Sequence, residues 1–466
     1  MNKYHSTTIG LLVMACSMLL STEETSAVIN SVGGTLITLT DTTTAPNGAW
    51  SWFQDERAII DDSDPNNTLL LVSSVSNTLT DDENGDINLL WRNLDTGQQG
   101  EFELHNQLRD NDHGSAALII RPDGKYVAMY TSHGDKFSRW RVSVTPHDPT
   151  AWTEEQRLAD PNSGTVTYSN LYYLPDDNGG AGRMYNFRRS FNLDPHIMVS
   201  NDFGTTWSSA GQLLTQGGEG DRPYLKYFSN GDKIHFTMTE EHPHDYDNSI
   251  YHGYVEDGKL YNSFGALVDS NLFDLSAAAP SDLTPVFSTG TSFGGTVMQR
   301  AWTIDTAIDT AGLPVTVFSA RAQDNALDHR FFYSKFDGAN WNTYEMADAG
   351  SYLYPREKDY TGLVSIDPDN PNIVYMSTDV DPRTGFNLEH YEIFRGETED
   401  GGATWDWMSI TFFSTVDNLR PLVPKWNDEE TALIWMRGNY STYKDWDTEV
   451  VALTDITPLD VVSIAD

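Results

Sequence analysis

Residues 200–207, SNDFGTTW, and residues 398–405, TEDGGATW, share the pattern S/T-x-D-x-G-x-T-W, and this repeat decides the fold that we expect. In such a stretch the Asp side chain bonds to the backbone of a tight hairpin, and Gly takes the positive φ that the turn needs. The Trp then packs between neighbouring sheets. Residues 334–341, SKFDGANW, are a degraded third copy. Two full matches are improbable by chance, so the chain is predicted to repeat one β-rich unit.

Short β-type runs follow one another along the rest of the chain, with almost no helical periodicity. Asp-Pro-Asn, Pro-Asp-Gly, Ser-Asn-Gly and Asp-Gly turns separate them. Regularly spaced short strands indicate an all-β sandwich, barrel or propeller, and the repeat favours a propeller. The runs are Leu69–Val75, Ala116–Ile120, Tyr126–Tyr130, Lys233–Thr239 and Ile373–Ser377.

We therefore predict an all-β fold, a single β-propeller of four-stranded antiparallel blades that spans residues 28–466. Blades of roughly 40–60 residues divide this length into about seven, although six or eight blades remain open. Val28–Leu39 and Glu449–Val462 are both strand-like. We expect these two ends of the chain to pair and close the ring.

The composition is strongly acidic, with 29 Lys and Arg against 68 Asp and Glu and a formal net charge of −39. This charge argues against a nucleic-acid partner, because phosphates would meet a repulsive field. The single Cys excludes a disulfide framework and a Cys-rich zinc module. An anionic ligand would therefore need a local cluster of Arg, Lys or His.

The N-terminus, Met1–Ala27, is predicted to be a secretory signal peptide. Lys3 provides the positive start, Ile9–Leu20 is the apolar stretch, and Thr25–Ala27 fits a cleavage site. Val13–Cys16 also resembles a lipoprotein processing box, but the apolar residues continue beyond it. No other apolar run approaches the roughly 20 residues that a membrane span needs. The mature protein is therefore expected to be extracellular or periplasmic, with no membrane span.

Two histidines, each followed by glycine, are the first candidate site residues. His113 lies in Asn111–Ala117, and His133 lies in Tyr130–Gly134 at the end of a neighbouring strand. The functional site of a propeller usually lies at one mouth of the central channel, so the two imidazoles are expected to converge there. Histidine titrates near neutrality and suits proton transfer. The alternative is two turn histidines that bond to backbone carbonyls.

Arginine and tyrosine gather in two further stretches of this base-poor chain. Tyr168–Tyr173 precedes Arg183–Arg189, and Arg222 lies beside Tyr224. Strand alternation puts Arg189 and Arg188 on opposite faces. These residues are the local positive cluster that an anion needs. The alternative is a set of Arg–Asp pairs and aromatic contacts between blades.

A third group of histidines suggests a metal ion. His235 and His252 would lie on neighbouring strands of one hairpin, with His242 in the loop between them. Three histidines with nearby carboxylates suit zinc or calcium. The spacing matches no strict metal signature, so a hydrogen-bonded loop is the other reading.

Together these stretches resemble the secreted bacterial β-propeller polysaccharide lyases that degrade ulvan, a sulfated green-algal polymer. The repeat itself resembles the Asp-box, or bacterial neuraminidase repeat, of sialidase-type propellers. The resemblance to the lyases covers roughly residues 48–260, and the C-terminal third matches only as a generic propeller. It implies β-elimination at glucuronate or iduronate, unsaturated uronyl products, no cofactor in the chemistry and room for a structural metal. We also expect a monomer.

The resemblance further implies roles for individual residues. His113 becomes the principal proton-transfer residue, as base, and Tyr173 becomes the donor to the leaving oxygen, with Tyr172 as its alternative. His133 and Arg189 lie on the carboxylate side, where neutralising the uronate acidifies its C5 proton. The remaining substrate contacts are Tyr224, Arg222 and Arg188, the last of which is also the alternative to Arg189.

Two other functions compete with this interpretation. A sialidase-like glycoside hydrolase needs three arginines around one carboxylate, which Arg189, Arg222 and Arg300 could supply, but the chain lacks an Arg-Ile-Pro motif. A non-catalytic carbohydrate-binding propeller would use the same aromatic residues for stacking on sugars.

Overall fold

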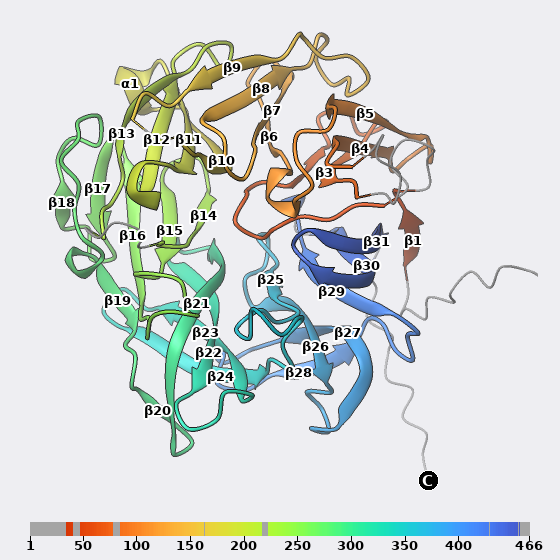
Figure 1. Cartoon of the computed structure of the whole chain (residues 1–466), viewed down its shortest axis with the longest axis vertical. Helices are drawn as coiled ribbons and strands as arrows, with labels where there is room; N and C mark the ends of the chain where they lie inside the picture. The colour runs from red at the N-terminus through yellow and green to blue at the C-terminus, as the bar shows by residue number, and fades with distance from the viewer. Residues whose placement is uncertain are drawn as a thin grey trace, which may run out of the picture.

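The computed structural model describes residues 34–40, 47–77, 84–162, 164–216, 222–427, 429–454 and 456. Within these ranges the chain forms seven antiparallel sheets around a central axis, as Figure 1 shows. The predicted seven-bladed β-propeller is therefore confirmed. The predicted signal peptide, Met1–Ala27, lies outside the described residues.

Blades 1 to 3 are four-stranded sheets that follow the order of the chain, with the first strand nearest the axis. Blade 1 contains β2 (Ala58–Asp61), β3 (Leu69–Val75), β4 (Ile87–Asn93) and β5 (Gln99–His105). Blade 2 contains β6 (Ala117–Ile120), β7 (Tyr126–Thr131), β8 (Phe137–Val142) and β9 (Gln156–Ala159). Blade 3 contains β10 (Thr167–Leu174), β11 (Arg183–Arg189), β12 (Pro195–Ser200) and β13 (Ser208–Gln212).

Blades 4 and 5 have more strands than the predicted four. In blade 4, β19 (Thr284–Phe287) pairs with β16 outside the main order of β14 (Leu225–Ser229), β15 (Ile234–Met238), β16 (Ile250–Glu256), β17 (Lys259–Asn262) and β18 (Leu267–Asp269). Blade 5 contains β20 (Ser292–Phe293), β21 (Thr296–Ile308), β22 (Pro314–Ala322), β23 (His329–Phe336) and β24 (Trp341–Asp348).

Blade 7 joins the two ends of the chain, as predicted. Blade 6 before it contains β25 (Val364–Ile366), β26 (Ile373–Val380), β27 (Asn387–Glu397) and β28 (Asp406–Ser409). Blade 7 contains β29 (Asp417–Leu422), β30 (Leu433–Thr442), β31 (Asp445–Thr454) and, on its outer edge, β1 (Thr35–Thr38). In this pairing Thr35 faces Thr454 and Thr38 faces Val451. The backbone hydrogen bonds of this strand pair join the two ends of the chain in one blade and so close the ring.

Helical structure among the described residues is limited to short turns. They are η1 (Asp112–Gly114), α1 (Asp177–Gly180), η2 (Phe191–Leu193) and η3 (Pro280–Asp282). None of these described helices is long and apolar enough to cross a membrane.

The two complete repeat stretches form turns with the same hydrogen bonds. Asp202 accepts from the backbone N of Thr206 at 2.8 Å and from its hydroxyl at 2.7 Å. The indole of Trp207 donates to the carbonyl of Gly204 at 3.2 Å. Residues 400–405 repeat these bonds. Trp207 packs with apolar side chains of blades 2 and 3, so each turn ties its blade to the preceding one.

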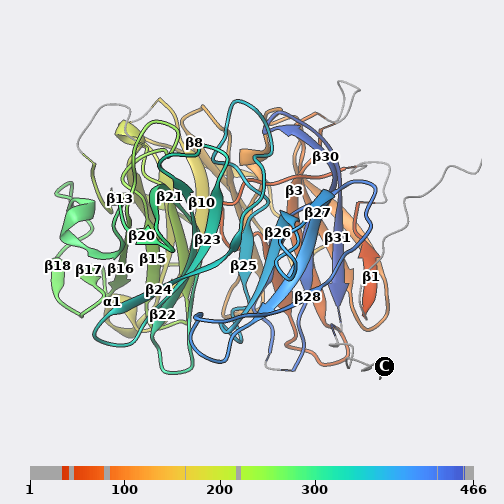
Figure 2. The same ribbon diagram turned by 90° about the horizontal axis from the view of Figure 1, so that it is seen from below.

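Much of the hydrophobic core lies between neighbouring blades. Between blades 3 and 4, for example, the rings of Phe187 and Tyr227 stack with centroids 4.7 Å apart. Figure 2 shows the sheets standing side by side around the ring, with connecting loops at both ends of the axis. Because the blades are held together by apolar packing, the axis and the loops are free to carry polar groups.

Candidate active site

Two histidines of blade 2 lie face to face at one mouth of the central channel. His113 is in the η1 turn before β6, and His133 follows β7. Their ring centroids are 4.2 Å apart and the ring planes differ by 10°. The structure therefore brings the two His-Gly pairs together, although they are separated by twenty positions in the chain.

Arg189 and Tyr168 complete this side of the mouth. Thr167 and Arg189 face each other in the β10–β11 pairing, so the guanidinium of Arg189 lies 4.8 Å from the ring centre of Tyr168 and 5.5 Å from that of Tyr224. The ring of Tyr168 is 5.5 Å from that of His113. Nε and Nη1 of Arg189 are buried without a hydrogen-bond partner, and the guanidinium has no carboxylate partner among the described residues. A buried cation without a carboxylate is costly unless an anion binds there.

Aromatic side chains from distant blades form the floor of the mouth. Trp52 packs against Trp302 at 5.0 Å and against Tyr360 at 4.5 Å between ring centroids. Phe53 packs against Tyr224 at 4.6 Å. These rings are buried, and Tyr224 joins them to Arg189.

Burial keeps both imidazoles neutral near pH 7. Burial lowers the pKa of His113 despite the neighbouring Asp112 carboxylate, which opposes the shift. Burial also lowers the pKa of His133 to about 2, with His113 and Arg189 adding to the effect. Burial raises the pKa of Tyr168 well above its usual range, so its phenol stays protonated. The cluster therefore holds two neutral bases, one neutral acid and one cation.

The opposite wall contains a carboxyl group that the sequence did not indicate. Nε2 of His242 lies 3.3 Å from Oε2 of Glu357, which comes from the loop between blades 5 and 6. The ring of His242 is 5.3 Å from that of Tyr224. Burial raises the pKa of Glu357 to about 7. Arg222 lies at the rim, where its half-exposed side chain pairs with Asp245 at 3.0 Å.

Tyr173, which was expected to act with His113, does not lie beside it in the structure. Its ring contacts Phe203 at 5.8 Å, and it lines a cavity of about 360 Å³ with Leu118 and Phe228. It lies five positions from Tyr168 along β10, a distance of roughly 16 Å at about 3.3 Å per residue. Tyr168 therefore takes the position beside His113. The hydroxyl of Tyr172, the alternative, is buried and donates to the carbonyl of Tyr227.

The side chain of Arg188, which was expected to contact substrate, is held by polar groups of blades 2 and 3. Its side chain is 1% exposed and forms an ion pair with Asp160 at 2.5 Å. It also donates to the hydroxyls of Ser138 and Ser209 at 2.8 and 3.0 Å. Arg188 is therefore part of the packing between blades 2 and 3.

The three histidines predicted to hold a metal do not form one site. Nδ1 of His235 lies 3.1 Å from Nε2 of His252, and Nδ1 of His252 lies 2.8 Å from the hydroxyl of Ser263. His242 is instead at the mouth, against Tyr224. No three His, Cys, Asp or Glu residues in the described part of the chain are placed to share a metal ion. These residues do not fit the predicted zinc or calcium site.

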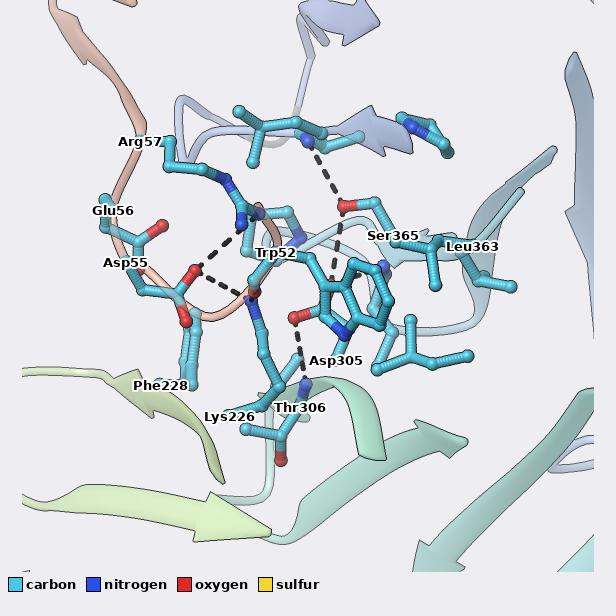
Figure 3. Close-up of a pocket in the computed structure, with 18 of the residues that line it drawn as sticks. Trp52, Asp55, Glu56, Arg57, Lys226, Phe228, Asp305, Thr306, Leu363 and Ser365 are labelled. Atoms are coloured by element: carbon cyan, nitrogen blue, oxygen red, sulfur yellow. Dashed lines mark hydrogen bonds and ion pairs between the residues drawn. The ribbon is translucent and has the colours of Figure 1, made fainter. Parts of the chain in front are cut away.

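A cluster of charged residues lines a pocket beside Trp52, as Figure 3 shows. Nζ of Lys226 lies 2.7 Å from Oδ1 of Asp55 and donates to the carbonyl of Trp52 at 2.8 Å. Glu56 lines both this cavity, of about 40 Å³, and the larger one beside Tyr173. Burial raises the pKa of Glu56 to about 8, and the Asp55 carboxylate adds to this shift.

Glu56→Gln is expected to flatten the dependence of stability on pH. The pKa of Glu56 is about 8 in the folded protein against about 4.5 unfolded. The contribution of neutral Glu56 to the free energy of unfolding is therefore complete below the unfolded pKa. It is lost as the pH rises through 8, the folded pKa. The melting temperature of the variant should exceed that of the wild type by several degrees at pH 8.5 and by little at pH 5. An equal difference at both pH values would contradict this.

A sequence model of the BNR repeat-containing family matches residues 52–349. That match covers more than half of the chain, and this protein therefore belongs to the BNR repeat-containing family.

Solved structures show the same fold at low sequence identity. An ulvan lyase described as a new family of polysaccharide lyase, solved bound to -[GlcA(1-4)Rha3S]-, is 15% identical, with 90% of this chain and 95% of that chain covered and a TM-score of 0.63. The polysaccharide lyase Uly1 is 12% identical, with 89% and 94% covered and a TM-score of 0.53. No curated protein sequence matches the chain.

Proposed function

We propose that this protein is a secreted polysaccharide lyase that cleaves a sulfated, uronate-containing polysaccharide of the ulvan type by β-elimination. One observation carries the proposal. A buried guanidinium without a carboxylate partner, that of Arg189, lies in the same cluster as two stacked, neutral imidazoles. The fold shared with an ulvan lyase bound to a GlcA–Rha3S oligosaccharide supports the same substrate class.

Each group of the cluster fits one requirement of β-elimination. Arg189 neutralises the uronate carboxylate and His133 donates a hydrogen bond to it, which acidifies the proton on C5. His113 removes that proton, the C5–H electron pair forms the C4–C5 double bond, and the C4–O4 bond breaks. The departing O4 takes a proton from Tyr168, which replaces Tyr173 in this role. Because glucuronate and iduronate present C5–H on opposite faces, His113 and Tyr168 exchange roles between the two substrates.

The arrangement disfavours a sialidase-like hydrolysis. That chemistry needs three arginines around one carboxylate, but Arg222 pairs with Asp245, and Arg300 pairs with Asp247, each at 3.0 Å. Only Arg189 of the three lacks a carboxylate partner in the described structure. A non-catalytic sugar-binding protein would not need a neutral base beside an unpaired cation.

The test is a screen of ulvan and other uronate polymers for an unsaturated uronyl product. A lyase produces near-ultraviolet absorbance from the new double bond. A hydrolase produces reducing ends without that absorbance, and a binding protein produces neither. Absence of the chromophore with every uronate polymer would overturn the proposed function.

Arg189→Gln and Arg188→Gln are expected to have opposite effects. The first removes the group that neutralises the carboxylate, so kcat/KM should fall about 100-fold while the melting temperature changes little. The second breaks a buried ion pair and leaves Asp160 without its cation, at a cost of about 3 kcal/mol or more. Its melting temperature should fall while the remaining folded enzyme stays active. The reverse pattern would exchange the roles of the two arginines.

A further inference from the structure

We propose that Asn111 and Asp112 hold the stacked imidazoles of His113 and His133 in opposite tautomers. They would thereby act as positioning residues for the lyase reaction on whose assignment this inference rests. Neither side chain was a candidate in the sequence, and neither needs to touch the substrate. Asn111 is the N-cap of the η1 turn, and Asp112 is its first residue.

The orientation of the Asn111 amide fixes the tautomer of His133. Oδ1 of Asn111 accepts from the backbone N of His113 at 3.0 Å. The other amide atom, Nδ2, therefore faces His133, and it lies 2.9 Å from Nδ1 of that ring. Nδ2 can only donate, so Nδ1 of His133 must accept. The proton of the neutral His133 ring is consequently on Nε2.

The Asp112 carboxylate fixes the opposite tautomer of His113. Oδ1 of Asp112 lies 2.7 Å from Nδ1 of His113. Neither atom has a hydrogen-bond partner elsewhere in the described part of the chain, so the two atoms face each other. A carboxylate oxygen at this distance from a nitrogen lone pair would be repelled, so Nδ1 carries the proton. The lone pair of the neutral His113 ring is consequently on Nε2.

Blade 7 holds Asp112 in place. Its other oxygen, Oδ2, lies 2.7 Å from Nη1 of Arg420 and accepts from the hydroxyl of Tyr440 at 2.7 Å. Burial would raise the pKa of Asp112, but His113 and Arg420 outweigh burial and lower it well below its usual range. Asp112 therefore stays ionised and oriented. The seventh blade, which closes the ring, thus holds the carboxylate beside His113 and also contacts His113 itself through the ring of Tyr443 at 5.5 Å.

The two tautomers divide the work of the imidazoles. His113 presents a basic Nε2 that can remove a proton. His133 presents an Nε2–H that can donate a hydrogen bond to the uronate carboxylate without carrying a charge. The charged and titratable groups that face His113 are Asp112, His133, Tyr168, Arg189, Arg420 and Tyr443.

Long-range ¹H–¹⁵N correlation spectra of the wild-type protein labelled with ¹⁵N-histidine test the proposal directly. The Nδ1–H and Nε2–H forms have different nitrogen shifts, and His113→Gln and His133→Gln identify the two signals. We expect Nδ1–H for His113 and Nε2–H for His133. The same tautomer in both rings would overturn the proposal. No substrate is used, so the outcome does not depend on the proposed function.

Asp112→Asn provides the kinetic test. Arg420 and Tyr440 donate to the oxygen of the new amide, so its nitrogen faces His113 and forces the proton onto Nε2. We expect the His113 signal to change tautomer and kcat to fall about 100-fold or more, with KM within about threefold of the wild type. Asp123→Asn, at an exposed turn of the same blade, is the control and should match the wild type. A folded Asp112→Asn enzyme with wild-type kcat would overturn the positioning role.

A wild-type protein that forms no unsaturated product would refute the proposed lyase but leave the tautomer measurement intact. Tyr440→Phe guards against a failure of Asp112→Asn to fold. It removes one hydrogen bond from Asp112 and keeps the ring that packs beside Arg420. A smaller loss of kcat, with the His113 tautomer retained, is expected. If kcat fell in every variant while His113 kept its Nδ1–H tautomer in all of them, the proposal would be contradicted.

Discussion

His113→Gln should abolish the formation of unsaturated uronyl ends, with kcat reduced by about 10⁴-fold. The amide of Gln can hydrogen-bond to substrate but cannot accept a proton near neutral pH. His113 is buried and packs between His133 and Tyr168, so no other base in the cluster occupies its position. The measurement is near-ultraviolet absorbance with ulvan as substrate.

The matched control is His147→Gln. His147 also lies beside a carboxylate, with Nδ1 2.7 Å from Oδ2 of Asp61, but it is not at the mouth. This variant should keep the wild-type rate. Full activity in His113→Gln would leave the fold assignment untouched and remove His113 as the base.

Tyr168→Phe should lower kcat about 10³-fold, because the leaving O4 loses its proton donor. The hydroxyl of Tyr168 is buried and has no hydrogen-bond partner in the described structure, so its removal costs little stability. The ring itself, which packs under Arg189 and beside His113, is retained. The rate is measured with the same absorbance assay and at saturating substrate.

Tyr173→Phe is the corresponding control and should leave kcat unchanged, since Tyr173 lies beside Phe203 at the other end of β10. The pair of variants separates the two tyrosines directly. If Tyr173→Phe were inactive and Tyr168→Phe active, Tyr173 would be the proton donor, as the sequence resemblance implied. If only Tyr224→Phe lost kcat, the proton donor would be the phenol of Tyr224, beside Arg189.

Local sequence accounts for the fold class and for half of the cluster. The repeat around Trp207 and Trp405 depends on contacts within eight residues, so its turns can be predicted without tertiary structure. His113 and His133 are also recognisable, because each is the only large functional group in a short, glycine-bounded segment. The pairing of the two ends of the chain followed from their strand-like composition.

The local sequence does not predict which residues of a strand lie at the mouth of the channel. Alternation shows that Arg188 and Arg189 point to opposite faces, but both faces of an inner blade strand are buried, so it does not show which one reaches the substrate. The choice between Tyr168 and Tyr173 is a choice between two ends of one strand. Nothing in the local pattern distinguishes those ends.

The sequence by itself predicted the repeated all-β architecture, its closure and the two histidines that the structure brings together, because these predictions depend on neighbouring residues. Only the tertiary structure decided which arginine and which tyrosine join them. It also supplied Trp302, Tyr360 and Arg420, which come from blades 5 to 7. The physical reason is that the blades of a propeller follow one another around a ring. Residues hundreds of positions apart meet at the axis, where packing rather than local pattern sets their neighbours.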